Sequence, residues 1–313
     1  MKHNYNQVED LSSQNRIYRK YRLFLLLCIS IVFMIIGTIW SLTYGAVNIS
    51  YRTIIEAMFF FDPSNDQHLL IREIRLPRAL AGGIIGGFLA VAGAIMQGVT
   101  RNPLASPNIL GVSDGAAFTI ALTLAFMPNT SYIGLIIVSF IGAGLAVFVI
   151  FGIGAFMKGL TPIQFVLLGT AVAMFFKSLS IGIAHMFNVQ QAMSFWFVGG
   201  LVGVKWNSLL LLSAIGLTAF VVAMLLSRQI TALNLSEENA ISLGLNVWKI
   251  KICSMLIVLV LTGSAVAIAG NIGFISLVIP HISRFLIGYD YMKVIPVSAV
   301  IGGTIAVIGG TGK

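Results

Sequence analysis

The sequence predicts an all-α membrane protein that crosses the bilayer many times, and three observations support this fold class. The chain of 313 residues is 58% hydrophobic and only 9% charged, and its mean hydropathy is +0.97. A soluble domain has about a quarter charged residues, so a soluble fold could not bury this much apolar surface. The apolar runs are continuous rather than alternating, which favours helices over the strands of a membrane barrel.

Nine apolar segments are expected to cross the membrane, most of them close to the roughly 20 residues that a spanning helix needs. Residues 1–22 form a polar tail, and the apolar run after them is too long for the core of a signal peptide. Residues 186–206 are expected to form a short interfacial or re-entrant helix. The predicted spans are residues 23–42, 79–99, 107–126, 133–157, 162–185, 207–227, 249–270, 274–289 and 294–310.

The basic residues predict the orientation of these spans. If the N-terminus lies in the cytoplasm, most lysines and arginines fall on the cytoplasmic side, as the positive-inside tendency requires. The exception is the extracytoplasmic segment 45–78, in which arginines cluster. This cluster either binds an acidic partner or snorkels at the membrane surface beside neighbouring carboxylates, and the residues alone leave both interpretations open. The arginines are Arg52, Arg72, Arg75 and Arg78.

The predicted second span, residues 79–99, carries small residues on one face. Gly82, Gly86, Ala90 and Ala94 recur at every fourth position, so they line one side of a helix. Small side chains allow two helix backbones to approach closely inside a membrane. We therefore expect this span to pack against another helix.

The cytoplasmic loop 228–248 is expected to contain a short capped helix. Ser236 is a favourable N-cap, Glu237 and Glu238 lie in the first turn, and Gly244 can adopt the left-handed conformation that ends a helix. Such a helix could seat in the groove of a soluble partner, or it could simply connect two spans. Its apolar side comprises Leu235, Ala240, Ile241 and Leu243.

The segment 272–284 predicts an interrupted helix late in the chain. Gly273 and Pro280 bracket a short apolar run, and proline removes a backbone donor and clashes with the preceding turn. A kinked span at membrane depth can line a path, or it can merely accommodate its neighbours. Both interpretations remain open.

Asp114 and Lys177 are the charged residues expected inside spans. Charges within a membrane commonly mark an ion or substrate path. Lys177 is expected close enough to the extracytoplasmic face to snorkel, and Asp114 can pair with a neighbouring helix. A proton-coupled carrier would need more such groups, so the sequence argues against one.

No metal, cofactor or catalytic site is expected. The histidines are scattered without ligand spacing, and Cys28 and Cys253 fall inside apolar runs. The terminal GGTGK lacks the first glycine of a phosphate-binding loop, because Val307 occupies that position. The net charge of +9 comes from single basic residues between apolar runs, so nucleic acid is not an expected partner.

Three motifs then occur in a characteristic order along the chain. They are RLPRALAGGIIGGFLAVAGAIMQGVTRNPLASPNILGVSDGAA, LSEENAISLG, and GFISLVIPHISR with IGYDYMKVIPVSAVIGG. In this order they resemble the permease subunits of ABC importers for iron–siderophores and vitamin B12, from about residue 23 to about residue 305. The resemblance implies a ten-span permease fold that is not itself an enzyme.

Members of that family work as assemblies, and this sets the expected partners. A second permease completes the pore, two cytoplasmic ATPase subunits power it, and an extracytoplasmic substrate-binding protein or lipoprotein delivers the chelate. The resemblance implies a location in the inner or plasma membrane, in contact with lipid, and the basic residues place the N-terminus in the cytoplasm.

The resemblance also implies roles for the loops. Arg75 and Arg78 match the arginines that receive acidic side chains of the binding protein. Arg101, Asn102 and Pro103 match the cytoplasmic turn after the second span. The residues that match the family's coupling helix, which rests in a cleft of the ATPase, are Leu235, Glu237, Glu238, Ala240, Leu243 and Gly244.

The sequence departs from the family pattern at its C-terminus. Family members continue beyond the ninth span through an Asp-x-x-x-Arg pattern into a tenth span, whereas this sequence reads GGTIAVIGGTGK and stops at Lys313. The expected permease domain therefore covers residues 23–313, with about nine spans, and is truncated at its C-terminus.

The function expected from the resemblance is import of ferric siderophores by alternating access, with ATP hydrolysis in separate subunits. The alternatives are a cobalamin or haem importer of the same family, an ion-coupled secondary carrier, and a non-transporting truncated remnant. A secondary carrier should show two related halves with paired broken helices, and the sequence contains no convincing repeat.

Overall fold

The computed structural model describes residues 2–45, 47–156, 162–201 and 203–310. Within these ranges the chain consists of helices and connecting segments, without a strand, so the all-α prediction is confirmed. The elements are α1 (Lys2–Thr43), α2 (Tyr51–Phe59), α3 (Asp66–Leu69), the π-helix η1 (Leu70–Arg75), α4 (Leu76–Thr100), the 3-10 helix η2 (Pro107–Leu110), α5 (Val112–Phe126), α6 (Tyr132–Phe156), α7 (Pro162–Met186), α8 (Gln190–Val198), α9 (Trp206–Leu235), α10 (Glu237–Ser242), α11 (Val247–Ala269), α12 (Ile275–Ile287) and α13 (Tyr291–Gly309).

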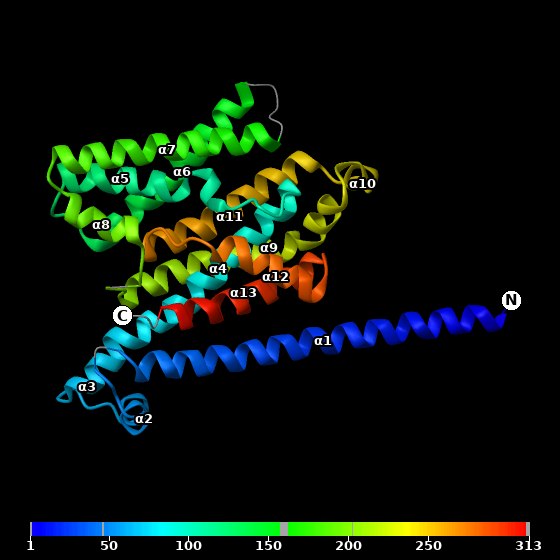
Figure 1. Cartoon of the computed structure of the whole chain (residues 1–313), viewed down its shortest axis with the longest axis horizontal. Helices are drawn as coiled ribbons and strands as arrows, with labels where there is room; N and C mark the ends of the chain where they lie inside the picture. The colour runs from blue at the N-terminus through cyan, green and yellow to red at the C-terminus, as the bar shows by residue number, and fades with distance from the viewer. Residues whose placement is uncertain (1, 46, 157–161, 202, 311–313) are drawn as a thin grey trace.

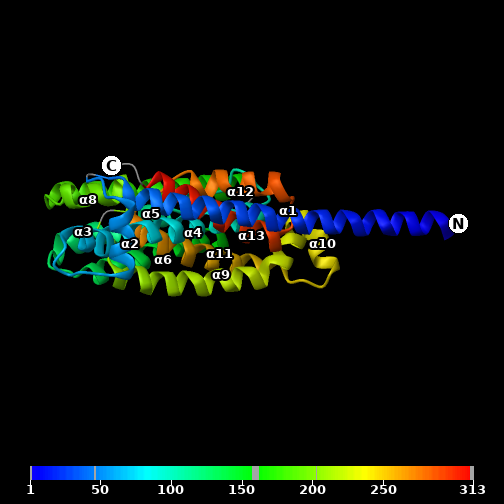
Figure 2. The same cartoon turned by 90° about the horizontal axis from the view of Figure 1, so that it is seen from below.

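The long helices run alongside one another and form a bundle with two distinct ends (Figure 1). The short helix α10 lies at one end, and α2, α3 and α8 lie at the other. The N-terminal part of α1 extends past the bundle on the α10 side, as Figure 2 also shows. The N-terminus and α10 are therefore on the same side of the bundle.

Seven helices of the described chain are long and apolar enough to cross a membrane: α1, α4, α6, α7, α9, α11 and α13. Two of the nine predicted spans are shorter than expected, because α5 has 15 residues and α12 has 13. A 3-10 turn that ends at Gly111, with a φ of +62°, delays the start of α5. Positive φ values at Gly270 and Phe274 interrupt the helical conformation between α11 and α12. The predicted short helix within 186–206 is present as α8.

Helix α4 is the central element of the bundle. In its most apolar stretch 83% of the residues are buried, against 6% for α1. It packs against α9, α11, α12 and α13, and its contact with α13 is the most extensive between any two helices of the described chain. A helix surrounded by protein in this way can transmit movement from one end of the bundle to the other.

The small-residue face predicted for α4 lies against α13, as expected for a helix–helix contact. A Cβ atom added at Gly86 would lie 2.3 Å from the carbonyl oxygen of Gly302. A Cβ added at Gly302 would in turn lie 2.5 Å from the Cβ of Ala90. The two backbones can approach this closely only because both helices carry glycine or alanine here.

Candidate functional sites at the two ends of the bundle

Helix α10 is short and well capped, as predicted. Its N-cap Ser236 accepts a hydrogen bond from the backbone N–H of Asn239 at 2.9 Å. Its end is closed by Gly244, whose φ of +74° lies in the left-handed region, and by a hydrogen bond from the Leu245 N–H to the Ala240 carbonyl at 3.0 Å. These caps stabilise a helix of six residues, which would be too short to persist alone.

Glu237, the first residue of α10, joins this helix to two others. Its Oε1 accepts a hydrogen bond from Nζ of Lys251 in α11 at 2.8 Å and another from Nη2 of Arg101 at 3.1 Å. The hydrogen bond from Lys251 lowers the pKa of the Glu237 carboxyl; the charges of Lys251 and Arg101 lower it further, and partial burial opposes them. The carboxylate is therefore held in its charged form between two cations.

Arg101 approaches Glu237 from the end of α4. It is the C-cap of that helix and has a φ of +53°, a conformation that is uncommon for residues other than glycine. Asn234 reinforces the junction, because its Nδ2 donates to the Gly98 carbonyl at 3.3 Å. The predicted turn after the second span thus has a defined partner in α10.

The other residues of that turn have different positions. The Asn102 side chain accepts a hydrogen bond from the Leu104 N–H at 2.9 Å, and its carbonyl accepts one from the Ala105 N–H at 3.1 Å. Pro103 is exposed. Arg101 therefore connects the turn to α10, whereas Asn102 stabilises the turn itself.

An exposed apolar surface, the α10 patch, surrounds this helix. Its four residues are 62–68% exposed, and a cluster of large apolar side chains at a polar end of the bundle is typical of an interaction surface. Ala240 is fully buried, so it packs α10 onto the bundle and is not part of the exposed surface. Glu238 is exposed. The α10 patch consists of Leu235, Ile241, Leu243 and Trp248.

At the opposite end of the bundle, Arg75 is buried and holds the end of α1. It is the last residue of η1 and is 9% exposed. Its Nη1 donates to the carbonyl oxygens of Leu42 at 2.6 Å and Thr43 at 3.3 Å, and its Nη2 donates to the Val47 carbonyl. A cation here satisfies carbonyls that the last turn of a helix leaves free. The guanidinium of Arg75 is thus engaged inside the chain.

Arg78 makes a similar contact with the end of α13. Its Nη2 donates to the Gly310 carbonyl at 2.9 Å, while its Nε is buried without a hydrogen-bond partner among the described residues. In the described part of the chain, neither Arg75 nor Arg78 forms an ion pair with a carboxylate. The two predicted docking residues therefore lie at one end of the bundle, and each anchors a different helix.

The other two arginines of the cluster, Arg52 and Arg72, are exposed at this end. Arg52 pairs with Glu56 at 2.9 Å. The Arg72 guanidinium lies 4.6 Å from the centre of the Phe61 ring, which holds it in a cation–π contact. Sequence reasoning placed Arg72 in the cluster without giving it a role, and the structure shows that it is the more accessible cation of η1.

The interruption predicted around Gly273 and Pro280 is present, with Gly273 in the break between α11 and α12 and Pro280 inside α12. The start of α12 packs tightly on α4, because a Cβ added at Gly93 would lie 1.8 Å from the carbonyl oxygen of Ser276. The hydroxyls of Ser276 and Ser106 are 3.1 Å apart. The broken segment thus lies against the central helix.

Lys177 lies within α7, close to the position that the predicted span 162–185 gives it. It precedes Met186, the last residue of the span Val166–Met186, by nine residues (186 − 177 = 9), which is about 14 Å along a helix. That the Lys177 side chain snorkels to the extracytoplasmic face stays a prediction. Its side chain is exposed on the bundle surface, and the half-buried Asp114 is near enough to interact with it electrostatically. The exposed face of α7 therefore needs polar surroundings at this depth.

Histidine, cysteine, aspartate and glutamate side chains do not gather in groups of three or more that could hold a metal ion within the described residues. The sites at the two ends consist of hydrogen bonds, ion pairs and exposed apolar surface.

Comparison with known proteins relates this architecture to membrane transport. The sequence model described as the FecCD transport family matches residues 33–311. The iron(3+)-hydroxamate import system permease protein FhuB of Bacillus subtilis (strain 168) is 45% identical over 290 residues, which cover 92% of this chain and 76% of that protein. The iron-uptake system permease protein FeuB of the same organism is 44% identical over 264 residues, covering 84% of this chain and 79% of that protein.

A solved structure shares the fold over nearly the whole chain. It is described as an inward-facing conformation of a metal-chelate type ABC transporter, and it superposes with a TM-score of 0.80 at 27% identity. The match covers 91% of this chain and 89% of the other.

Proposed function

This chain belongs to the FecCD transport family, and from that premise we propose that it is the permease subunit of an ABC importer for ferric siderophores. It is a multi-pass membrane protein with an ABC transporter permease fold. Two of its relatives are named as permeases for iron(3+)-hydroxamate import and for iron uptake. Those names support an iron chelate as the substrate, and the chain itself supplies a path rather than a reaction.

The observation that carries this proposal is the way α10 is exposed and anchored at the same time. An importer powered by separate ATPase subunits needs a helix that the ATPase can bind and that is rigidly connected to the membrane spans. The α10 patch offers the apolar surface, which suits a groove in a soluble partner. Glu237 supplies the anchor through Arg101 on α4 and Lys251 on α11. Movement of α10 would thus pass directly to α4 and α11.

The proposal fixes the orientation of the chain. The two ATPase subunits bind at the α10 end, which is therefore cytoplasmic, and the N-terminus lies in the cytoplasm with them. The segment between α1 and α4 then faces the extracytoplasmic side, where an extracytoplasmic substrate-binding protein or lipoprotein delivers the chelate.

Docking of the binding protein is assigned to Arg72, Arg75 and Arg78, with a different role for each residue. Arg78 and the exposed Arg72 offer positive charge, which steers acidic side chains into place and fixes their register. Arg75 acts mainly by positioning, because its guanidinium holds the end of α1 and the loop after it.

A second permease, either another copy of this chain or a related one, completes the path. Lys177 supports this part of the proposal, since a charge exposed in the middle of a span is costly against lipid. The face of α7 that carries it suits a subunit interface or a water-filled path. The apolar surface of α1, which is largely unburied, suits contact with membrane lipid.

Reconstitution tests the proposal directly. The chain, its ATPase and its binding protein are placed in proteoliposomes, and uptake of radioactive iron is measured with hydroxamate, citrate and haem chelates in parallel. We expect ATP-dependent uptake of a ferric siderophore. Leu243→Asp in the α10 patch should abolish ATPase binding and uptake, whereas Phe60→Asp, which changes a 77% exposed residue at the opposite end, should leave ATPase binding intact.

Other results would contradict the proposal. Uptake that requires an ion gradient and ignores ATP would identify a secondary carrier. If the assembly forms and its ATPase hydrolyses ATP, but no chelate is transported, the chain would be a non-transporting subunit. Preference for haem would leave the assignment as an importer permease intact and would replace the ferric siderophore as its substrate.

A further inference from the structure

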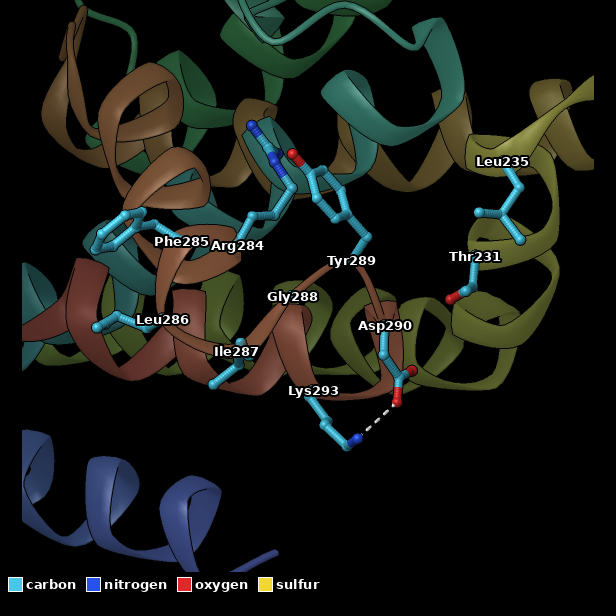
Figure 3. Close-up of a pocket in the computed structure, with 10 residues that line it drawn as sticks. All are labelled: Thr231, Leu235, Arg284, Phe285, Leu286, Ile287, Gly288, Tyr289, Asp290 and Lys293. Carbon is cyan, nitrogen blue, oxygen red and sulfur yellow. Dashed lines mark ion pairs between the residues drawn. The ribbon is translucent and has the colours of Figure 1, made fainter. Parts of the chain in front are cut away.

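A cavity of about 480 Å³ opens at the α10 end of the bundle, where Leu235 of the α10 patch forms part of its wall. It lies between the end of α9, the last turn of α12 and the first turn of α13 (Figure 3). Its polar lining consists of Thr231, Arg284, Tyr289, Asp290 and Lys293.

Arg284 is the unusual member of this lining. It is 8% exposed, yet its Nη1 has no hydrogen-bond partner among the described residues. The position in the last turn of α12 suits a cation, because the helix dipole is negative there. That general attraction does not replace the hydrogen bonds that a buried guanidinium requires, and leaving them unmade is costly.

Two tyrosines complete the cluster around Arg284. The Tyr291 side chain is fully buried, and its hydroxyl faces the Arg284 guanidinium without a hydrogen bond of good geometry in the described chain. It lies close to both Arg284 and Tyr289. Its ring is fixed against α4, because a Cβ added at Gly98 would lie 2.5 Å from it. In Figure 3 the side chains of Arg284 and Tyr289 extend toward one another.

The carboxylate of this lining is engaged elsewhere. Asp290 pairs with Lys293 at 3.1 Å and accepts a hydrogen bond from the Met292 N–H at 3.1 Å. Figure 3 shows this pair pointing away from Arg284 and Tyr289. The cluster of Arg284, Tyr289 and Tyr291 therefore offers donors without a carboxylate to receive them, which is the composition of an anion site.

We propose that this cavity binds the phosphate of an anionic phospholipid headgroup. A guanidinium is a strong hydrogen-bond donor to phosphate oxygens, and the hydroxyl of Tyr289, which also lines the cavity, adds a further donor. The depth is suitable, because the span of α13 begins at Tyr291 and basic pockets between spans on the cytoplasmic side bind such headgroups. Phe285, beside the cavity, is 84% exposed, and aromatic side chains favour the membrane–water boundary. The site does not depend on which chelate is transported.

The test uses the full-length chain purified in detergent. Thermal unfolding is followed while phosphatidylglycerol, phosphatidylcholine or inorganic phosphate is added, and native mass spectrometry counts the lipids that remain bound. We expect phosphatidylglycerol to raise the unfolding temperature at concentrations where phosphatidylcholine does not. Arg284→Gln should abolish this preference, and Tyr289→Phe should weaken binding about tenfold through the loss of one charge-assisted hydrogen bond.

Arg228→Gln is the matched control. Arg228 is an exposed cation of α9 whose Nε lies 3.3 Å from the Met292 sulfur, so it belongs to the same end without lining the cavity. This variant should bind phosphatidylglycerol like the wild type. Tyr289→Phe keeps the test decisive if Arg284→Gln fails to fold, because Tyr289 is 64% exposed and its ring is retained.

Four results would overturn the proposal. Equal stabilisation by phosphatidylglycerol and phosphatidylcholine would show that the cavity does not prefer anionic headgroups. Unchanged lipid binding by Tyr289→Phe would show that the cluster around Arg284 does not form the binding site. Inorganic phosphate that matches phosphatidylglycerol and competes with it would keep the phosphate chemistry and exclude the lipid. Loss of ATPase binding in Arg284→Gln with unchanged lipid binding would assign the cavity to a protein partner.

Discussion

Arg101 and Glu237 are 136 positions apart in the sequence, and their side chains meet at 3.1 Å between the end of α4 and the start of α10. Their side chains are 43% and 38% exposed, and an ion pair of this kind contributes only about 0–1 kcal/mol to stability. Its importance lies in geometry. Together with Lys251, it sets the position of α10 relative to the central helix.

Arg101→Gln should therefore uncouple the proposed importer more than it destabilises the chain. We expect the unfolding free energy to change by less than about 1 kcal/mol, while the number of chelates transported per ATP hydrolysed falls several-fold. The measurement compares uptake and ATP hydrolysis in the same proteoliposomes. Arg52→Gln breaks the exposed pair with Glu56 at the other end and should change neither quantity; normal coupling in Arg101→Gln would refute a mechanical role for the pair.

The pH dependence of α10 follows from the lowered pKa of Glu237. Because the carboxyl pKa lies below its ordinary value of 4.5, the stabilisation is complete above that value and is lost as the pH falls through the lowered pKa. Hydrogen exchange of the α10 amides measures this, with Glu237→Gln as the comparison. The variant should be less protected at neutral pH by at most about 1 kcal/mol. A difference that survived strong acid would point to a cause other than the carboxylate charge.

Gly86→Ala should destabilise the bundle, because the contact of α4 with α13 leaves no room for a methyl group. The added Cβ would lie 2.3 Å from both the Gly302 carbonyl oxygen and the Ala306 Cβ, and overpacking of this kind costs about 1–3 kcal/mol. Thermal unfolding in detergent gives the measurement. Gly182→Ala in α7, where nothing lies within 4 Å, is the control. It should be neutral or slightly stabilising, since alanine favours helix by up to about 1 kcal/mol.

Arg75→Ala separates the positioning role from direct docking. Loss of the hydrogen bonds to the Leu42, Thr43 and Val47 carbonyls should cost about 1.5–3 kcal/mol, as expected for a charged donor. Limited proteolysis between α1 and α2 should become faster, whereas Arg52→Ala, at an exposed position, should behave like the wild type. If proteolysis and stability stay unchanged while binding-protein docking is lost, Arg75 contacts the partner directly.

The parts of the fold that depend on local sequence rules were predictable. Ser236 and Gly244 mark the ends of α10 because side-chain capping and left-handed glycine act within a few residues. The small-residue face of α4 was visible because its spacing matches the helical period. Its partner, α13, carries matching glycines, although nothing in the spacing says which two helices meet.

The parts that were missed depend on tertiary placement. The reach of Arg101 to Glu237, and of Arg75 to the end of α1, joins segments whose proximity is created only by the folded bundle. The break before α12 was expected at Gly273, yet Phe274 has the positive φ, a conformation that sequence rules reserve for glycine. The exposed Trp248 belongs to the next helix, α11, and lies beside α10 only in the folded bundle.

Contacts at both ends of α4 fix its length as well as its packing. Arg78, in the first turn, bonds to Gly310, and Arg101, 23 residues later (101 − 78 = 23), bonds to Glu237. One inserted or deleted residue would rotate one end against the other by about 100° and shift it by about 1.5 Å. Either contact could then be kept only by giving up the other, or by turning the glycine face away from α13. The number of residues in α4 is therefore constrained by contacts at both of its ends.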